Sequence, residues 1–340
     1  MENKELNEIL NQLKLPEHII KQVNDLVASY QGRMQKDNSF SFEYCPKCGQ
    51  WHPILTKGGK TKAGKQMYKC MHCGKRFVED HGKLTYYSHK DISFWEDIAI
   101  DTLNGTSIKG THERTGAATT TIFYMRHKLM ALLEECMQEN TLSNNIQMDE
   151  TFVQGSHKGI RIEGLMSRTN GEKSSFRGTS REKLCIVCGV EPNGAAYARS
   201  YNAGQMNSAT LRKYMDHIDR GSTVTTDNNN TYGLLEKEHQ VKWNICYDCR
   251  DHKADINLNA VNSFHSMIKS YHKNHRGMAT KYLNRYCNML SLKWNLLRTN
   301  TSEYMDEIIR VLKNSIFMIP RTLLSEYKIY APADMIWRIA

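Results

Sequence analysis

The sequence predicts an α/β protein in which a mixed sheet follows a small metal-binding unit and a helical segment. Short runs rich in β-branched residues, separated and followed by segments of helical periodicity, predict the sheet and its helices. Two closely spaced Cys-x-x-Cys pairs near the N-terminus predict the metal-binding unit. The expected strands are 146–153, 184–190, 195–201, 222–226 and 241–246, and the expected helices of the same region are 207–218, 259–271 and 280–297.

The balance of charge favours a polyanionic partner. The 340 residues carry 46 Lys and Arg against 36 Asp and Glu, a formal net charge of +10, and nucleic acid is the commonest such partner. The chain is long enough for two or three domains. It contains no run of about 18 apolar residues and no apolar signal-peptide segment, so we expect an intracellular protein.

Changes in composition predict how the chain is divided. A Gly-, Ser- and Lys-rich stretch at 154–182 is too long for an ordinary strand connection, which indicates a mobile or functional loop that contacts DNA or a second subunit. The expected segments are an N-terminal helical segment with a linker at 1–42, a zinc ribbon at 43–80, a three-helix domain at 91–138, the α/β domain at 144–300 and a helical tail at 301–340.

The cysteine pairs are the strongest local signal. Cys45 and Cys48 precede one glycine, and Cys70 and Cys73 precede another, so that two Cys-x-x-Cys-Gly knuckles supply four thiolates. Zinc prefers four such ligands in a tetrahedron, and the metal supplies folding energy to a unit too small for its own core. The sequence therefore predicts a structural Zn²⁺ ion in a zinc ribbon.

The stretch between the knuckles is basic. The run from Lys57 to Arg76 holds seven Lys and Arg and no acidic residue, which favours contact with DNA phosphates over a merely solvated loop. The lysines expected to contact DNA are Lys57, Lys60, Lys62 and Lys65.

Residues 93–128 have the pattern of a helix-turn-helix. A capping box formed by Ser93 and Glu96 is expected to open the first helix, a second is expected over 107–114, and a third over 118–135. The exposed start of a third helix can enter a major groove, although a plain helical bundle has the same pattern. The side chains expected to reach bases and phosphates are Thr119, Thr120, Thr121, Tyr124, Arg126 and Lys128.

Acidic side chains occupy informative places in the α/β region. Asp149 lies within the first expected strand and Asp227 directly follows the fourth, where ligand crevices open in such sheets. Asn262 follows on a helix, with His265 and Lys269 on the same face. Two carboxylates and a third oxygen ligand can hold two Mg²⁺ ions, which activate a water or hydroxyl for phosphoryl transfer. Lys269 is then expected to hold a DNA phosphate.

Three blocks of sequence resemble a known family. MDETFVQG, TVTTDNNNTYG and the long block NLNAVNSFHSMIKSYHKNHRGMATKYLNRYCNML resemble the catalytic blocks of bacterial insertion-sequence DDE transposases with an N-terminal zinc ribbon, which are relatives of the eukaryotic Merlin elements. The resemblance covers residues 43–298. It implies a ribonuclease-H-like fold, Mg²⁺- or Mn²⁺-dependent cleavage at terminal inverted repeats and strand transfer into target DNA. It also implies a homodimer or larger assembly on DNA, in the bacterial cytoplasm and nucleoid.

The resemblance assigns the metal ligands and departs from the DDE pattern at one of them. Asp149 and Asp227 match the first two carboxylates, while Asn262 stands where the family has glutamate, as in a branch of the family. An amide carbonyl is a weaker, neutral ligand, so His265 or a nearby carboxylate is a candidate helper. Glu150 is the poorest of these helpers because it points to the opposite strand face from Asp149. Arg276, within the third block, is a further expected DNA contact.

Several alternatives stay open at this stage. Cys185, Cys188, Cys246 and Cys249 could form a second zinc site, but in a strand Cys185 and Cys188 face opposite ways, so buried thiols are the simpler expectation. The rival functions are a domesticated DNA-binding protein without catalysis and a metal-dependent nuclease without strand transfer. A zinc-ribbon transcription factor leaves the α/β region unexplained.

Overall fold

The computed structural model forms two compact units that meet between His81 and Gly82. It describes residue 42 and residues 44–62, 64–86, 88–137, 141–156, 176–248, 256–275, 278–297, 308 and 311–312. The predicted N-terminal helices, most of the loop at 154–182, most of the C-terminal tail, Arg276 and Cys249 lie outside these residues. Within the described part, no helix combines the length and apolar character needed to cross a lipid bilayer.

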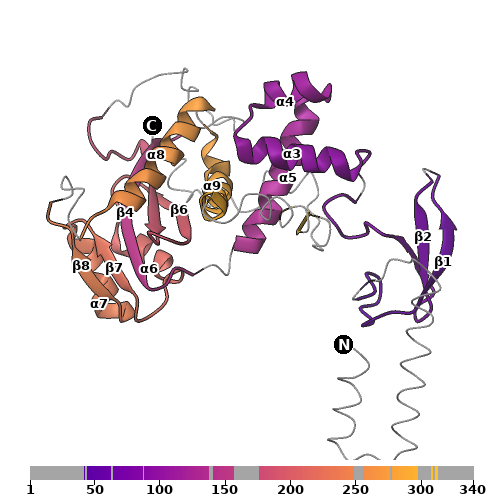
Figure 1. Ribbon diagram of the computed structural model, residues 1–340, viewed down its shortest axis with the longest axis horizontal. Helices are drawn as coiled ribbons and strands as arrows, with labels where there is room; N and C mark the ends of the chain where they lie inside the picture. The colour runs from indigo at the N-terminus through magenta and orange to yellow at the C-terminus, as the bar shows by residue number, and fades with distance from the viewer. Residues whose placement is uncertain are drawn as a thin grey trace, which may run out of the picture. The chain divides into compact units, whose positions relative to one another are not determined.

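The first unit is a small antiparallel sheet. Its strands are β1 (Leu55–Lys60), β2 (Gln66–Cys70) and β3 (Arg76–Val78), in that order (Figure 1). Tyr68 and Phe77 pack with Phe42, Cys45 and Cys70 in a core of only five buried residues. So small a core does not hold a fold by itself, which is consistent with a metal-stabilised ribbon.

Three helices open the second unit at the predicted positions. They are α3 (Ile92–Asn104), α4 (Ile108–Thr115) and α5 (Thr119–Met137). The side chain of Ser107 accepts the N–H of Gly110 and caps α4. The predicted capping box at Ser93 was wrong. Asp91 caps α3 instead, because its carboxylate accepts the N–H of Phe94.

The rest of the second unit is a five-stranded mixed sheet with helices on both faces (Figure 1). The strand order is β6-β5-β4-β7-β8. β5 runs antiparallel to β4 and β6, whereas β4, β7 and β8 are parallel to one another. This is a ribonuclease-H-like arrangement, as predicted. The elements are β4 (Asn145–Gln154), β5 (Lys183–Val190), β6 (Ala196–Ala203), α6 (Ser208–Met215), β7 (Thr223–Thr226), η1 (Asn230–Tyr232), α7 (Gly233–His239), β8 (Lys242–Ile245), α8 (Asn259–Asn274), η2 (Thr280–Tyr282) and α9 (Leu283–Leu297).

Alternating residues of the strands face two different cores. On β4, Ile146 and Met148 pack on the side of α6 and α7. Val153, of opposite parity, packs on the side of α5, α8 and α9. Cys185 belongs to the first core and Cys188 to the second. The two thiols therefore point to opposite faces, as strand geometry predicts.

Helix α9 covers the edge of the sheet at β6. The side chains of Asn295, Ser291 and Asn284 accept the N–H groups of Ala196, Ala198 and Ser200 at 2.7, 3.0 and 2.8 Å. The amide of Asn284 also donates to the carbonyl of Ser200. Because an uncovered edge strand exposes unpaired backbone groups, these bonds both close the sheet and fix α9 against it.

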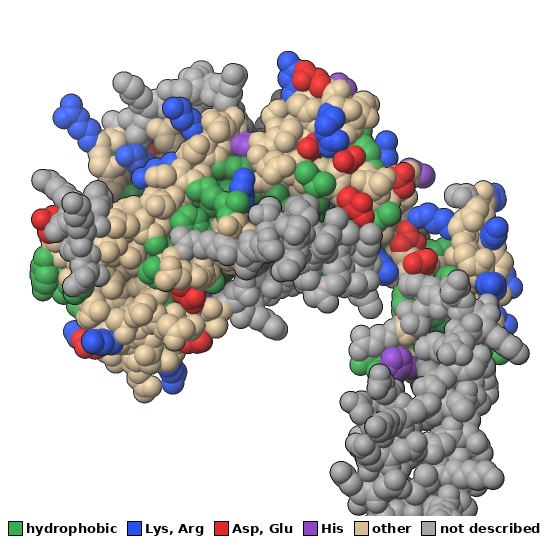
Figure 2. All heavy atoms as spheres, in the orientation of Figure 1, with side chains coloured by type: hydrophobic (Ala, Val, Ile, Leu, Met, Phe, Trp, Pro, Cys, Tyr) green, Lys and Arg blue, Asp and Glu red, His purple; other side chains and the backbone are tan. Residues whose placement is uncertain are grey.

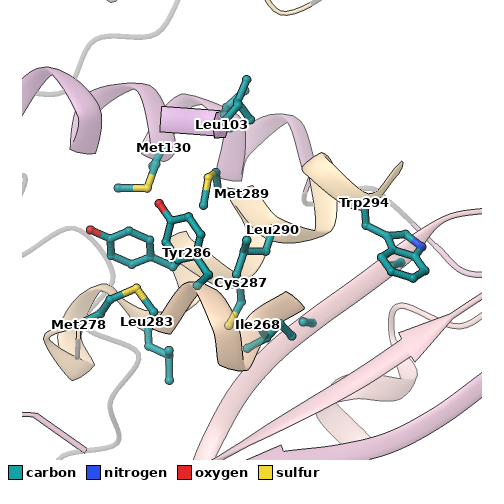
Figure 3. Packing of buried hydrophobic residues seen from close by; sticks show 14 of the residues in the cluster. Leu103, Met130, Ile268, Met278, Leu283, Tyr286, Cys287, Met289, Leu290 and Trp294 are labelled. Carbon is teal, nitrogen blue, oxygen red and sulfur yellow. The ribbon is translucent and has the colours of Figure 1, made fainter. Parts of the chain in front are cut away.

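The three-helix segment shares a core with the sheet. Figure 3 shows Leu103 of α3 and Met130 of α5 packed beside Tyr286 and Met289 of α9, and all belong to one buried cluster that continues under β5 and β6. A buried ion pair of 3.5 Å between Glu134 of α5 and Arg199 of β6 joins the same parts. The three helices and the sheet therefore share this apolar core and form one packed unit.

His127 of α5 is buried in this interface without hydrogen bonds. Its ring lies 4.3 Å from that of Phe123 and 4.2 Å from that of Tyr282, and neither ring nitrogen has a partner. Burial, with the charges of Arg285 and Arg126, lowers the pKa of His127 well below its usual value. The imidazole is therefore neutral in the folded protein.

We expect His127→Phe to stabilise the protein by about 1–3 kcal/mol at neutral pH, because it removes buried unsatisfied polar atoms. The folded-state pKa is depressed, so the wild type loses stability as pH falls below about 6.5, where only the unfolded state takes up the proton. The advantage of the variant then grows by up to about 1.4 kcal/mol per pH unit. Urea unfolding between pH 7.5 and 5 measures both effects.

An exposed control, His89→Phe, is expected to change stability by less than about 0.5 kcal/mol. Parallel pH profiles for wild type and His127→Phe would contradict this account.

Candidate functional site

The four ribbon cysteines converge. Their sulfur atoms all lie within 4.8 Å of one another, and Sγ of Cys45 is 3.9 Å from Sγ of Cys73. Tetrahedral coordination with Zn–S bonds of about 2.3 Å requires sulfur atoms about 3.8 Å apart. The donor set therefore fits zinc in geometry and in chemistry.

Each knuckle is shaped by the glycine that follows it. Gly49 and Gly74 have φ of +73° and +70°, a conformation that L side chains rarely adopt, and their N–H groups donate to the carbonyls of Cys45 and Cys70. The backbone N–H of Lys75 lowers the pKa of the Cys73 thiol to about 7, whereas desolvation and the neighbouring thiols raise the pKa of Cys48. The Cys-x-x-Cys-Gly pattern is thus a conformational requirement as well as a ligand set.

Basic side chains line the ribbon (Figure 2). Lys57, Lys60 and Lys62 are exposed. Lys65 is also exposed, but its ammonium pairs with Asp80 at 2.8 Å, so part of its charge is already compensated. Lys69 pairs in register with Arg76, and both are exposed. These last two residues add to the lysines expected from the sequence.

Of the α5 residues that are expected to contact DNA, only those at the start of the helix are exposed. Thr119 and Thr120 at the beginning of α5 are exposed, whereas Thr121, Tyr124 and Lys128 are half-buried. Arg126 is 1% exposed and donates to Thr111 Oγ1 of α4 at 3.3 Å, so its predicted contact with DNA was wrong. Helical periodicity turns position 126 inward, where the guanidinium joins the interface with α4.

Asp149 and Asp227 come together through strand register. β4 and β7 are parallel and pair Gln147 with Thr225, and Asp149 and Asp227 each lie two residues beyond this last pair, where the ladder between the two strands ends. Asp227 is held by a turn in which its Oδ1 accepts the N–H of Asn229 at 3.2 Å. Asp149 Oδ1 accepts the N–H of Glu150 at 2.8 Å.

Negative charge accumulates at this point of the sheet. Burial and the charge of Asp227 raise the pKa of Asp149 to about 6, while Lys269 acts in the opposite direction. Burial and the charges of Asp149 and Asp227 raise the pKa of Glu150 to about 7. A cluster of carboxylates with too little positive charge around it is what a divalent cation neutralises, so the donor chemistry fits Mg²⁺ or Mn²⁺.

Glu150 points to the opposite face from Asp149, as predicted. Its Oε1 lies 3.4 Å from Nδ2 of Asn229, under the turn that carries Asp227. Its carboxylate is nevertheless electrically coupled to both aspartates. Strand alternation alone therefore underestimates this residue, because Asn229, in the turn after β7, reaches the carboxylate of Glu150.

Helix α8 carries the other predicted site residues, Asn262, His265 and Lys269. Nδ1 of His265 lies 3.9 Å from Oδ2 of Asp149, and the imidazole is buried. Burial lowers the pKa of His265 to about 4, so it is neutral at pH 7. Lys269 follows one turn later and is exposed, and Asn262 lies one turn earlier and is exposed. Within the described residues no hydrogen bond joins the Asn262 amide to either aspartate.

The sulfur atoms of the ribbon cysteines lie closer together than the side-chain ligand atoms of the carboxylate site. Among the His, Cys, Asp and Glu side chains that the structure describes, the ribbon cysteines are the one group of three or more within 4.8 Å. The carboxylate site is more open. No second cysteine cluster forms in the described part of the chain, where Cys185 and Cys188 occupy opposite faces of the sheet.

One buried polar residue beside the site was missed in the sequence. Gln147 lies on β4 two residues before Asp149, on the same face, and is 9% exposed. Its carbonyl accepts two N–H groups of α8. The available signal was a glutamine between the apolar Ile146 and Met148, at the alternating position that Asp149 shares.

A polar cavity of about 650 Å³ opens on this face of the sheet, on the amino-terminal side of the two aspartates. Asn145, Gln147, Thr223, Thr225 and Asn244 line it from the strands, and Ser263 lines it from α8. Among the described residues, hydroxyl and amide side chains therefore share its wall with the apolar Ile146, Pro192, Ile256 and Ala260, and no charged side chain lines it.

Comparison with known proteins finds transposase sequences that are similar to this region. Residues 141–295 match the model of the ISXO2-like transposase domain, which spans β4 to α9. An uncharacterized protein in transposable element ISH50 of Halobacterium salinarum is 22% identical over 272 residues, or 78% of this chain and 90% of that protein.

Solved structures with similar parts are more distant. The Mos1 strand transfer complex contains a chain with 12% identity and a TM-score of 0.29, over 66% of this chain and 75% of that one. A chain of the simian T-cell lymphotropic virus intasome, solved with a PP2A regulatory subunit, has 13% identity and a TM-score of 0.29, over 60% and 69%.

The ribbon makes a direct prediction about zinc. We expect the purified chain to hold one zinc ion, Cys48→Ser to lose most of it, and His72→Gln, an exposed change in the second knuckle, to keep it. Elemental analysis of each protein measures the metal. Chelation is expected to abolish hydrogen-exchange protection at Tyr68 and Phe77 while leaving that of Val187 in β5 unchanged. Equal zinc loss in both variants would contradict the four-cysteine site.

Proposed function

We propose, on the premise that residues 141–295 form an ISXO2-like transposase domain, that this chain binds the terminal inverted repeats of its element, cleaves phosphodiester bonds there and joins the freed ends to target DNA. The observation that carries the proposal is the meeting of Asp149 and Asp227 on neighbouring parallel strands. Their charges are coupled, and Asp149 is held above its normal pKa by burial and by Asp227.

The two aspartates are the proposed ligands of two Mg²⁺ ions, with Mn²⁺ as a substitute. Divalent ions in such a site activate the attacking water or hydroxyl and stabilise the leaving oxygen of phosphoryl transfer. The protein side of the mechanism is to hold the carboxylates in place. Asp227 is fixed by its bond from the N–H of Asn229, and Asp149 by its bond from the N–H of Glu150.

Helix α8 completes the proposed site. Asn262 offers a neutral amide oxygen as the third ligand, at the exposed position one turn before His265. His265 is neutral and buried beside Asp149, 3.9 Å from its carboxylate, so it packs against that carboxylate without competing for its charge. Lys269 is the proposed phosphate contact, since it is exposed and its charge acts on Asp149. Glu150, on the other side of the strand, is an alternative carboxylate that could assist as a ligand.

DNA recognition is assigned to the N-terminal parts. The exposed lysines of the ribbon fit contact with the phosphate backbone, which needs positive charge and no particular sequence. The exposed start of α5, at Thr119 and Thr120, fits contact with base edges. Since two element ends must be handled together, we propose that the chain acts as a homodimer or larger assembly on DNA.

We expect Asp227→Asn to lower cleavage by at least about a hundredfold, because it removes a charged ligand worth several kcal/mol in the transition state. The assay uses the full chain, Mg²⁺ and a labelled DNA fragment that carries an end of the element. Asp216→Asn, an equivalent change at an exposed position after α6, is the matched control and is expected to cleave as the wild type does.

The same assay separates the rival functions. Equal cleavage by wild type and Asp227→Asn would remove the carboxylate chemistry. Cleavage without joining of pre-cut ends to a plasmid would identify a nuclease. Specific DNA binding without any cleavage would identify a non-catalytic DNA-binding protein.

The ribbon lysines make a separate prediction about salt. Replacing Lys57, Lys60 and Lys62 together by Gln is expected to weaken DNA binding and to reduce the slope of log K against log salt by about 2–3, or about 0.9 for each lost phosphate contact. Fluorescence anisotropy at several salt concentrations measures the slope. Lys237→Gln, an exposed change on α7, controls for net charge. An unchanged slope in the triple variant would remove the ribbon from the DNA interface.

A further inference from the structure

The helix that carries Asn262, His265 and Lys269 has no side-chain cap at its N-cap position. α8 begins at Asn259, and the preceding residue, Leu258, has an apolar side chain that accepts no N–H group of the first turn. Such groups need partners when the helix end is packed in a protein. The partner comes from the other end of the domain's sequence.

Gln147 of β4 supplies the missing cap. Its Oε1 accepts the N–H of Ala260 at 2.8 Å and that of Val261 at 3.3 Å. Its Nε2 donates to Oδ1 of Asn257 at 3.2 Å, and the same oxygen of Asn257 accepts the N–H of Asn259 at 3.1 Å. A single buried amide therefore binds the first turn of α8 and, through Asn257, the residues that lead into it.

The Gln147 cap and the contact between Asp149 and His265 are separated by similar distances along β4 and along α8. Gln147 and Asp149 are separated by about 6.6 Å along a strand. Val261 and His265 are separated by about 6 Å along a helix. Gln147 therefore contacts α8 at one level and Asp149 faces His265 at the next, 3.9 Å away.

The polar cavity borders one side of the start of α8. Asn259, Ala260 and Ser263 line the cavity together with Gln147 itself. On the other side, Leu258 and Val261 are buried in the apolar core. Because apolar packing has no preferred direction, the hydrogen bonds from Gln147 are contacts that resist sliding and rotation of α8 against β4.

We propose that Gln147 is a positioning residue of the catalytic site, which sets the register of α8 against β4. Through that register it places Asn262, His265 and Lys269 relative to Asp149 and Asp227. The proposal rests on the proposed function for its consequence in catalysis, while the cap itself is independent of it.

The test compares full-length wild type with Gln147→Met, which keeps the length of the side chain and removes both polar groups. Hydrogen exchange is expected to lose at least about tenfold in protection at Ala260 and Val261, since each loses a hydrogen bond. Single-turnover cleavage of the labelled end fragment is expected to fall about 10–100-fold, because small misplacements of reacting groups are costly. DNA affinity is expected to stay within about twofold, and the Mg²⁺ concentration for half-maximal cleavage to rise.

Two further variants keep the test decisive. Gln147→Glu keeps an acceptor at the positive end of the helix and is expected to restore protection at Ala260 and Val261. Asn145→Ala changes the same face of β4 one alternation earlier, where no hydrogen bond to α8 exists among the described residues, and is expected to leave all readouts unchanged. Should Gln147→Met fail to fold, Asn257→Ala removes one bond of the network and is expected to shift the same readouts less.

Three outcomes would overturn the positioning role. They are full protection of both amides in Gln147→Met, cleavage equal to wild type, and a loss of DNA affinity that matches the loss of cleavage. An inactive wild type would instead refute the proposed function and leave the hydrogen-exchange result to decide the cap.

Discussion

The short parallel pairing of β4 with β7 is the constraint on which the site depends. β4 is paired with β5 along most of its length, but with β7 only over residues 145–147. Beyond Gln147 the two strands part, and the backbone groups there need other partners. The N–H of Glu150 is satisfied by the carboxylate of Asp149. The carboxylates of the site therefore lie where the hydrogen-bonded pairing of β4 with β7 ends.

Polar side chains, more than apolar ones, fix where the helices lie on this sheet. Apolar packing favours contact but tolerates sliding, because it has no preferred direction. The bonds from Asn284, Ser291 and Asn295 of α9 to β6 have a direction, as do those from Gln147 to α8. Helix α8, beside the site, and helix α9, at the β6 edge, are therefore both held in register by amide and hydroxyl groups. A site that needs fixed distances between strand and helix residues gains from such bonds.

The two units depend on different sources of stability. Among its described residues the ribbon has few buried side chains and four converging thiolates, so we expect a metal to supply its folding energy. The second unit has a continuous apolar core from α3 to α9. It can therefore tolerate costly features, such as the neutral buried imidazole of His127 and the crowded carboxylates of Asp149, Asp227 and Glu150. The crowded charges lie where a cation can offset them.

The sequence by itself determined the elements and most of the residues that matter. Every predicted strand of the sheet lies within two residues of its expected bounds, because the runs of β-branched residues and the turns between them are local signals. The cysteine knuckles were evident from spacing alone. The tertiary structure alone decided which groups face one another. Arg126 turned inward, Asp91 replaced Ser93 as a cap, and Gln147 reached a helix more than a hundred residues away. Such contacts join residues distant in sequence, and no local pattern encodes them, because their partners are set by strand order and helix packing.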